Sequence, residues 1–63
     1  MNKPTKSEVV PGLILASTAV KTSGGEVLVL NVPTSGNTVC VEAFDWRGEP
    51  YTRNVPLSSL RWQ

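Results

Sequence analysis

The chain has 63 residues, no histidine, one cysteine and a net charge of +1, and these values exclude several classes of protein. A lone cysteine, Cys40, cannot close a disulfide within one chain or, without histidine, build a Cys/His zinc site. The charge is too small to indicate nucleic-acid binding on electrostatics alone. Apolar runs such as Val27–Leu30 are far shorter than a membrane span, and the polar N-terminus lacks the apolar stretch of a secretory signal. We therefore expect a cytoplasmic protein without membrane contact.

The length predicts one small domain. Residues 1–8 are polar and show no apolar periodicity, so they are interpreted as a flexible N-terminal arm. Residues 9–63 are expected to form the folded domain, which is near the lower size at which one core offsets the entropy of ordering the chain. Self-association would stabilise such a domain.

Residues 13–20 can be interpreted as a strand or as a helix. Their length and β-branched residues suit a strand. No N-cap residue stands before Leu13, Ser17 and Thr18 interrupt the apolar stripe, and Pro11-Gly12 is typical of a turn. The sequence favours a strand, with a helix as the alternative.

Glycine-centred turns separate the strands that follow. A turn over 21–25, with Ser23-Gly24-Gly25 at its centre, precedes a strand over 26–32 that ends at Pro33, because proline cannot donate to a sheet. The turn Ser35-Gly36-Asn37 then leads into a strand over 38–44. Two strands across a short loop predict an antiparallel hairpin.

The segment Asp45-Trp46-Arg47-Gly48 predicts a second hairpin. It is typical of a type I turn followed by glycine in the left-handed conformation, and it returns the chain through a strand over 51–55. Residues 56–60 suit one turn of 3₁₀ helix, because a proline opens the segment and its leucines are three apart. Residues 61–63 are expected to form a final short strand.

This order of elements is that of an SH3-like barrel, so the predicted fold is all-β with about five short antiparallel strands and a 3₁₀ turn before the last one. Closing a small sheet in this way hides its edges. The predicted core consists of apolar residues from the later strands and the 3₁₀ turn: Val27, Val29, Val39, Val41, Val55, Leu57 and Leu60.

The stretch 12–60 resembles the YodC-like family of small bacterial proteins. In that family a valine and a lysine precede a Ser-Gly-Gly turn, a strand follows, and a Phe-Asp pair closes the next strand. The corresponding segments here are Val20-Lys21-Thr22-Ser23-Gly24-Gly25, Val27-Leu28-Val29, Phe44-Asp45 and Leu57-Ser58-Ser59-Leu60. The family's Pro-x-Met-Thr is replaced by Glu26-Val27-Leu28-Val29, and its tryptophan before the phenylalanine is Ala43. The family is of unassigned function, so the resemblance implies a fold.

The segment Pro56-Leu57-Ser58-Ser59-Leu60 also resembles the Pro-Val-Ala-Ala-Leu ending of type II plasmid-borne dihydrofolate reductases, which are short SH3-like barrels. Those enzymes carry Gln-Ile-Tyr just before that proline, lining a pore formed by four subunits. Arg53-Asn54-Val55 stands there in this chain. Resemblance in scaffold does not transfer function, so an oligomeric-pore reductase is only a remote alternative.

Four residues are the candidate binding site: Trp46, Arg47, Tyr51 and Arg53. Trp46 is expected at the tip of a turn, where it can anchor a contact or fold back over the barrel. Tyr51, Phe44 and Trp62 could extend it into an aromatic patch of the kind that binds proline-rich peptides, although packing of a C-terminal strand explains Trp62 more simply.

The arginines suggest a second class of ligand. Arg47, Arg53 and Arg61 with interleaved aromatic rings could contact single-stranded nucleic acid by stacking and phosphate binding. Acidic residues at 42, 45 and 49 lie among them, and cross-strand ion pairs on a solvated face explain that alternation more simply.

The strands over 26–32 and 38–44 carry apolar residues on both faces. Leu28, Leu30 and Val32 oppose Val27 and Val29, while Cys40 and Phe44 oppose the valines of the next strand. A small barrel has one interior, so the apolar outer face predicts a homo-oligomer. Cys40 has no histidine to activate it and is interpreted as a half-buried structural residue.

The sequence as a whole favours a small, non-enzymatic binding module that mediates protein–protein interaction or self-association. No cofactor or metal site is expected. An RNA or single-stranded DNA partner is the alternative from another class.

Overall fold

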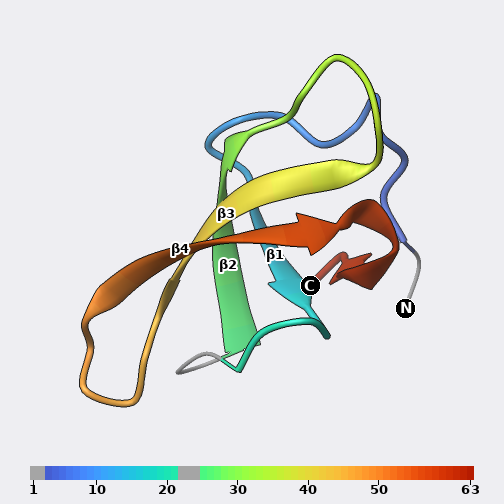
Figure 1. Cartoon of the computed structure of the whole chain (residues 1–63). Coiled ribbons are helices and arrows are strands. Elements are labelled where there is room, and N and C mark those ends of the chain that lie inside the picture. The colour runs from blue at the N-terminus through green and yellow to red at the C-terminus, as the bar shows by residue number, and fades with distance from the viewer. Residues whose placement is uncertain (1–2, 22–24) are drawn as a thin grey trace.

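Short β-branched runs between glycine turns assemble into one antiparallel sheet. The computed structural model describes residues 3–21 and 25–63. Its strands are β1 (Ile14–Ser17), β2 (Glu26–Asn31), β3 (Thr38–Phe44), β4 (Pro50–Pro56) and β5 (Leu60–Arg61), with the 3₁₀ turn η2 (Leu57–Ser59) before β5. The strand order is β4-β3-β2-β1-β5 (Figure 1). The all-β class and the 3₁₀ turn ahead of the last strand are confirmed.

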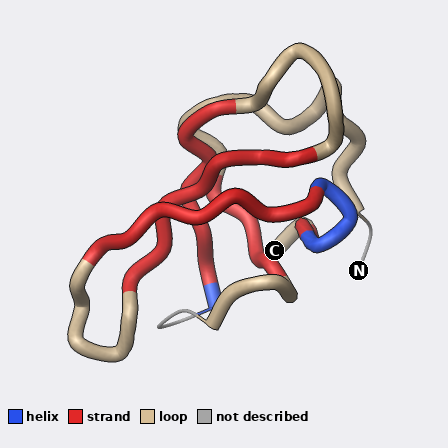
Figure 2. The backbone as a smooth tube through the Cα atoms, in the orientation of Figure 1, coloured by secondary structure: helices blue, strands red, loops and turns tan. Residues whose placement is uncertain are grey.

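The sheet curls around an interior without closing. Figure 2 shows the strands bending about a common centre, with η2 joining β4 to β5. These two strands are the edges of the sheet, so the barrel is open between them. The backbone N–H of Leu57 donates to the carbonyl of Asn37 at 2.6 Å, which ties η2 to the loop between β2 and β3. Within the described ranges no helix has the length and apolar character needed to cross a membrane.

The ambiguous segment after Gly12 is a strand. Residues 14–17 pair with β2, with Leu15 opposite Val27, and with β5, with Ser17 opposite Leu60. The hairpin between β3 and β4 has the longest continuous register, from Thr38 opposite Pro56 to Phe44 opposite Pro50. The turn centred on Ser23-Gly24 lies outside the described residues.

The core is built from β-branched and aliphatic side chains on the inner face of the sheet. Six of the seven predicted core residues are buried, and Leu57 is partly buried and packs against them. Two large side chains were not predicted: Leu15, fully buried on β1, and Val9, which precedes it. The complete buried apolar set is Val9, Leu15, Val27, Val29, Val39, Val41, Ala43, Val55 and Leu60.

One predicted position on the outer face is wrong. Strict alternation placed Val32 with Leu28 and Leu30, but Val32 packs against the core. The pairing of β2 with β3 shifts register between Val29 and Asn31, and β2 ends at Asn31. A register shift of this kind reverses which side chains face the interior.

The N-terminal residues contact the domain. Pro4 is buried, and the Lys6 ammonium donates to the carbonyl of Gly36 at 2.6 Å. A turn follows in which Glu8 accepts from the backbone N–H of Thr5 at 2.8 Å and from its hydroxyl at 3.0 Å. The hydrogen bond from the Thr5 backbone has the larger effect and that from the Thr5 hydroxyl the smaller one, and together they lower the pKa of Glu8 below its ordinary value of 4.5. The flexibility of residues 1–8 stays a prediction.

Candidate functional site

The tip of the β3–β4 hairpin is fixed by local hydrogen bonds. The Asp45 carboxylate accepts from the backbone N–H of Arg47 at 2.8 Å and of Glu49 at 3.0 Å. The N–H of Gly48 donates to the Asp45 carbonyl at 2.9 Å, and Gly48 has a φ of 82°. This is the predicted turn with glycine in the left-handed region, and it holds residues 46 and 47 out at the end of the hairpin.

Trp46 is the most exposed large apolar side chain among the described residues, at 84%. It does not fold back over the barrel, so the second of its two sequence interpretations is wrong, and its role as a contact anchor stays a prediction. The guanidinium carbon of Arg47 lies 5.1 Å from the centre of the Trp46 ring, within the range of a cation–π contact. The tip therefore presents an apolar ring with a positive charge stacked on it.

Tyr51 and Arg53 form a second pair on β4. They lie two residues apart, and their register partners are the inward-facing Ala43 and Val41, so both belong to the inner face at the edge of the sheet. The guanidinium carbon of Arg53 is 5.5 Å from the Tyr51 ring centre. The Tyr51 hydroxyl donates to the carbonyl of Lys21 at 2.5 Å, which fixes the ring.

The four predicted site residues are thus brought together as two arginine–aromatic pairs. A ring contact joins the two members of each pair, and no ring contact or hydrogen bond joins one pair to the other in the described part of the chain. The predicted aromatic patch of four rings is wrong. Phe44 lies opposite Pro50 on the outer face, whereas Tyr51 follows the inner register, and Trp62 packs against the core as the simpler interpretation had it.

The cross-strand ion pairs expected on β3 and β4 are absent among the described residues. Glu42 lies opposite Thr52 on the outer face, while Arg53 lies opposite Val41 on the inner one. Asp45 is engaged in the turn instead, and Arg61 donates to the carbonyls of Ser58 and Leu60 at 2.6 and 2.9 Å. The charges of Arg47 and Arg53 therefore remain available to a ligand.

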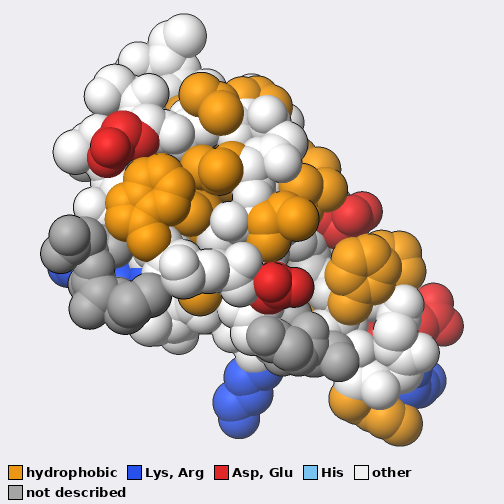
Figure 3. Space-filling view, turned by 180° about the vertical axis from the view of Figure 1, so that it is seen from behind, with side chains coloured by type: hydrophobic (Ala, Val, Ile, Leu, Met, Phe, Trp, Pro, Cys, Tyr) orange, Lys and Arg blue, Asp and Glu red, His pale blue; other side chains and the backbone are white. Residues whose placement is uncertain are grey.

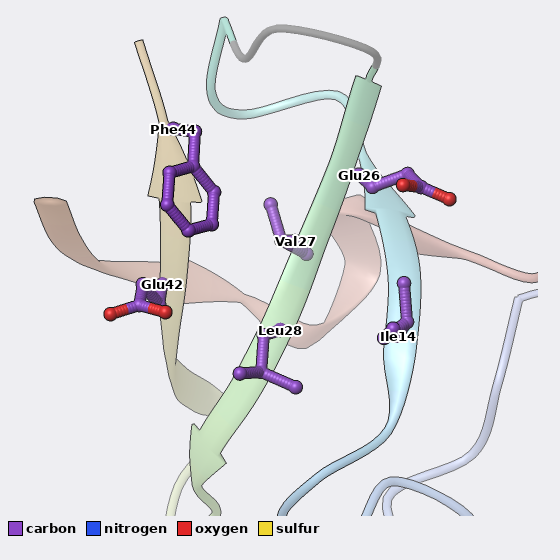
Figure 4. A pocket seen from close by; sticks show the side chains of 6 residues that line it. All are labelled: Ile14, Glu26, Val27, Leu28, Glu42 and Phe44. Carbon is purple, nitrogen blue, oxygen red and sulfur yellow. The ribbon is translucent and has the colours of Figure 1, made fainter. Parts of the chain in front are cut away.

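The outer face of β1, β2 and β3 contains a shallow apolar hollow of about 250 Å³. We call it the sheet hollow. Its lining residues are Ile14, Glu26, Val27, Leu28, Glu42 and Phe44. Figure 4 shows the Leu28 and Phe44 side chains over the gap between β2 and β3, with the carboxylates of Glu26 and Glu42 directed to opposite sides. In the space-filling view of Figure 3, hydrophobic side chains gather on this side of the molecule, with acidic groups among them.

The large apolar residues that line the sheet hollow are unusually exposed. Ile14 is 53% exposed and Phe44 is 45% exposed. Glu26 accepts a hydrogen bond from the side-chain amide of Gln63 at 2.8 Å. Glu42 makes no hydrogen bond or ion pair to any other residue of the described ranges, and it is only half-buried. The sheet hollow is an apolar surface with a negative rim.

Sequence reasoning anticipated part of this surface. The alternation in residues 26–32 and 38–44 indicated Leu28 and Phe44 on an apolar outer face, as the register shows. It missed Ile14, because the continuous apolar run from Leu13 to Ala16 hides the two-residue period, and it assigned no role to the acidic rim. Cys40 is half-buried on the same face, as expected.

No family model matches the chain, and neither the curated proteins nor the solved structures contain a match to it. The resemblances to YodC-like proteins and to type II dihydrofolate reductases stay predictions. In residues 3–21 and 25–63 no group of three or more His, Cys, Asp or Glu side chains is placed to hold a metal ion.

Proposed function

We propose that this protein is a small, non-enzymatic binding module that contacts a protein through the tip of its β3–β4 hairpin. Trp46 supplies the apolar contact area and Arg47 an orienting charge, with Tyr51 and Arg53 as a second contact on the same hairpin. The observation that carries the proposal is the 84% exposure of Trp46 on a turn whose conformation is fixed by the Asp45 carboxylate.

Two physical arguments support this assignment. Tryptophan and arginine are the residue types most enriched among side chains that dominate interface energies. An indole on a preformed turn loses little conformational freedom when it is buried by a partner, so more of its burial contributes to affinity. The Trp46 ring makes no contribution to the core, and burial by a partner would give this exposed ring the apolar contacts that the fold does not provide.

Trp46→Ala tests the proposal. Immobilised wild-type protein and the variant are each exposed to a lysate of the native host, and the retained proteins are compared. We expect the variant to keep its fold by circular dichroism and to lose the captured partner. Val10→Ala, which truncates another exposed apolar residue at a distance from the hairpin tip, is the matched control and should capture normally. Undiminished capture by Trp46→Ala would refute the site assignment.

The two arginine–aromatic pairs also suit single-stranded nucleic acid, in which bases stack on rings and phosphates pair with arginine. The same capture experiment with and without nuclease separates the two ligands. A nucleic-acid contact loses affinity steeply with salt because it releases counterions, whereas an aromatic protein contact does not. Loss of capture after nuclease treatment would favour this second candidate.

The reductase alternative has one direct test. Purified protein is assayed for dihydrofolate reduction with a nicotinamide cofactor. We expect no turnover, because Arg53-Asn54-Val55 replaces the pore-lining residues of the enzymes that the ending resembles, and Val55 is buried in the core. Turnover that scales with protein concentration would contradict the non-enzymatic assignment.

A further inference from the structure

The hairpin tip and the sheet hollow have complementary properties. The tip is an exposed indole with a guanidinium stacked on it. The hollow is apolar at its base and carries two carboxylates at its rim. A ligand for the hollow must combine a large apolar group with a positive charge, and this combination is present on the chain itself.

The sizes agree. An apolar cavity of about 150 Å³ holds a benzene molecule. The hollow, at about 250 Å³, has room for the two fused rings of an indole. Inserting Trp46 would also cover Ile14 and Phe44, two of the large apolar side chains that are exposed on this chain.

The charges of the hollow and the hairpin tip are also complementary. Glu42 makes no hydrogen bond or ion pair to the other described residues, and the Arg47 guanidinium makes none to them beyond its ring contact with Trp46. Because the Arg47 guanidinium carbon lies 5.1 Å from the Trp46 ring centre, seating Trp46 of another copy in the hollow would bring Arg47 to the rim that carries Glu42. The pairing satisfies both charges at the edge of an apolar contact, which is the usual arrangement of an interface rim.

Trp46 does not occupy the hollow of its own chain, because its side chain is 84% exposed and is not among the lining residues. Phe44 lines the hollow and Trp46 lies two residues beyond it, on a turn that projects away from the sheet. A second copy related by a two-fold axis has its own tip and hollow equally close together. If each tip enters the hollow of the other copy, the same contact forms twice and gives a closed, symmetric dimer, the commonest form of self-association.

We infer that the sheet hollow is the docking site for the hairpin tip of a second copy of this chain, with Trp46 in the hollow and Arg47 paired with Glu42 of the partner copy. The inference rests on the proposed function and deepens it, since it names the protein that the tip contacts. Two tips and two hollows make a small interface, which belongs to the weak class that buries less than about 1,200 Å². We expect a dissociation constant of roughly 10–500 μM.

Charge reversal tests the pairing. Glu42→Arg and Arg47→Glu are purified separately and studied by sedimentation velocity between about 20 μM and 1 mM, the range that brackets a weak interface. In each variant alone, both contacts oppose like charges, and we expect dimerisation at least about tenfold weaker than in the wild type. An equimolar mixture restores opposite charges at both contacts, because each copy contributes one native and one reversed member. The mixture should return to wild-type affinity.

Lys21→Glu is the matched control, because it changes the same amount of charge at an exposed site outside the lining of the hollow. It should dimerise like the wild type. The fold of each variant is checked by the dispersion of its amide NMR signals. A wild-type chain that is monomeric at about 1 mM, or a mixture no more dimeric than its two components, would overturn the inference.

Trp46→Ala separates this inference from the proposed function. If the inference alone fails, purified wild type stays monomeric while the variant still loses a foreign protein captured from lysate. If the proposed function fails, the variant captures like the wild type. Dimerisation of Trp46→Ala with wild-type affinity would also overturn the inference, because the indole would then not be the group that enters the hollow.

Discussion

The interior of the sheet and the tip of the β3–β4 hairpin are held in place by different forces. Leu15 and its neighbours are positioned by contacts between residues far apart in sequence, and Leu15 has no exposed surface. Trp46 is larger but contacts little beyond Arg47, and its position depends on hydrogen bonds within residues 45–49. One of the two tryptophan rings of the chain is therefore outside the part that stabilises the fold, whereas the other, Trp62, packs against the core. Truncating the core should affect stability, and truncating the tip should affect binding.

The largest effect is expected at Leu15→Ala. Removing a fully buried leucine leaves a cavity and costs about 2–5 kcal/mol of unfolding free energy, which is a large part of what a domain of this size possesses. Ile14→Ala, one residue away on the outer face and 53% exposed, is the matched control and should cost less than about 1 kcal/mol. Urea unfolding of both variants measures the difference. Equal losses of unfolding free energy in the two variants would show that side chains on the two faces of β1 contribute equally to stability.

A smaller loss is expected at Gly48→Ala. Gly48 has a φ of 82°, and the space around a β-carbon there is open, so the cost is backbone strain alone. Strain of this kind is about 1–2 kcal/mol. Thermal unfolding measures it, and amide NMR should place the largest shifts at residues 45–49. A loss of stability as large as that of Leu15→Ala would contradict the conclusion that the tip is held only by interactions within residues 45–49.

Ser59→Ala probes a polar group inside the core region. Ser59 is 6% exposed. Its hydroxyl donates to the Pro56 carbonyl at 2.7 Å and lies 3.0 Å from the Ser17 hydroxyl, with which it shares a hydrogen bond. We expect a loss of about 1 kcal/mol in chemical unfolding, because the Pro56 carbonyl loses its donor and the Ser17 hydroxyl loses its partner in a partly buried site. Thr52→Ala, at an exposed position of β4, serves as the control and should leave stability within about 0.5 kcal/mol.

The smallest effect concerns Glu8, in a second turn built by local hydrogen bonds. Its pKa is lowered in the fold by bonds from Thr5, the backbone one first. A lowered pKa stabilises the fold above the ordinary pKa, and this contribution is lost as the pH falls through the folded value. NMR titration of the Glu8 carboxyl should show a midpoint below 4.5, and Thr5→Ala should raise it part of the way. An ordinary midpoint in the wild type would indicate that residues 5–8 are a flexible arm.

Local signals in the sequence predicted the strands well. The bounds of β3 were obtained from the turns on either side, because Gly36 and Gly48 need left-handed backbone that few other residues adopt. The burial of Leu15 was missed because it depends on β5 pairing with β1 across most of the chain. The aromatic patch was wrong for a simpler reason: the predicted turn already fixes Phe44 opposite Pro50, which sends Tyr51 to the other face.

The sequence predicted which residues form the candidate site, but it did not predict how their side chains are arranged. The turn motif was sufficient to place Trp46 and Arg47 at an exposed tip. The pairing of Arg53 with Tyr51 depends on side-chain conformations, which a sequence does not specify. The acidic rim of the sheet hollow depends on the bulge in β2, since a shift between Val29 and Asn31 decides which residues of β2 and β3 share a face.

The unpaired edges of the sheet limit how copies of this chain can aggregate. β4 begins and ends with proline, which has no N–H to offer an incoming strand, and β5 is two residues long. Extension of the sheet from one molecule into the next, the route to fibrils, is therefore hindered at both ends of β4 and has only a short strand to pair with at β5. With Ile14 and Phe44 exposed on the outer face, association of copies through side chains is therefore favoured over association through backbone edges.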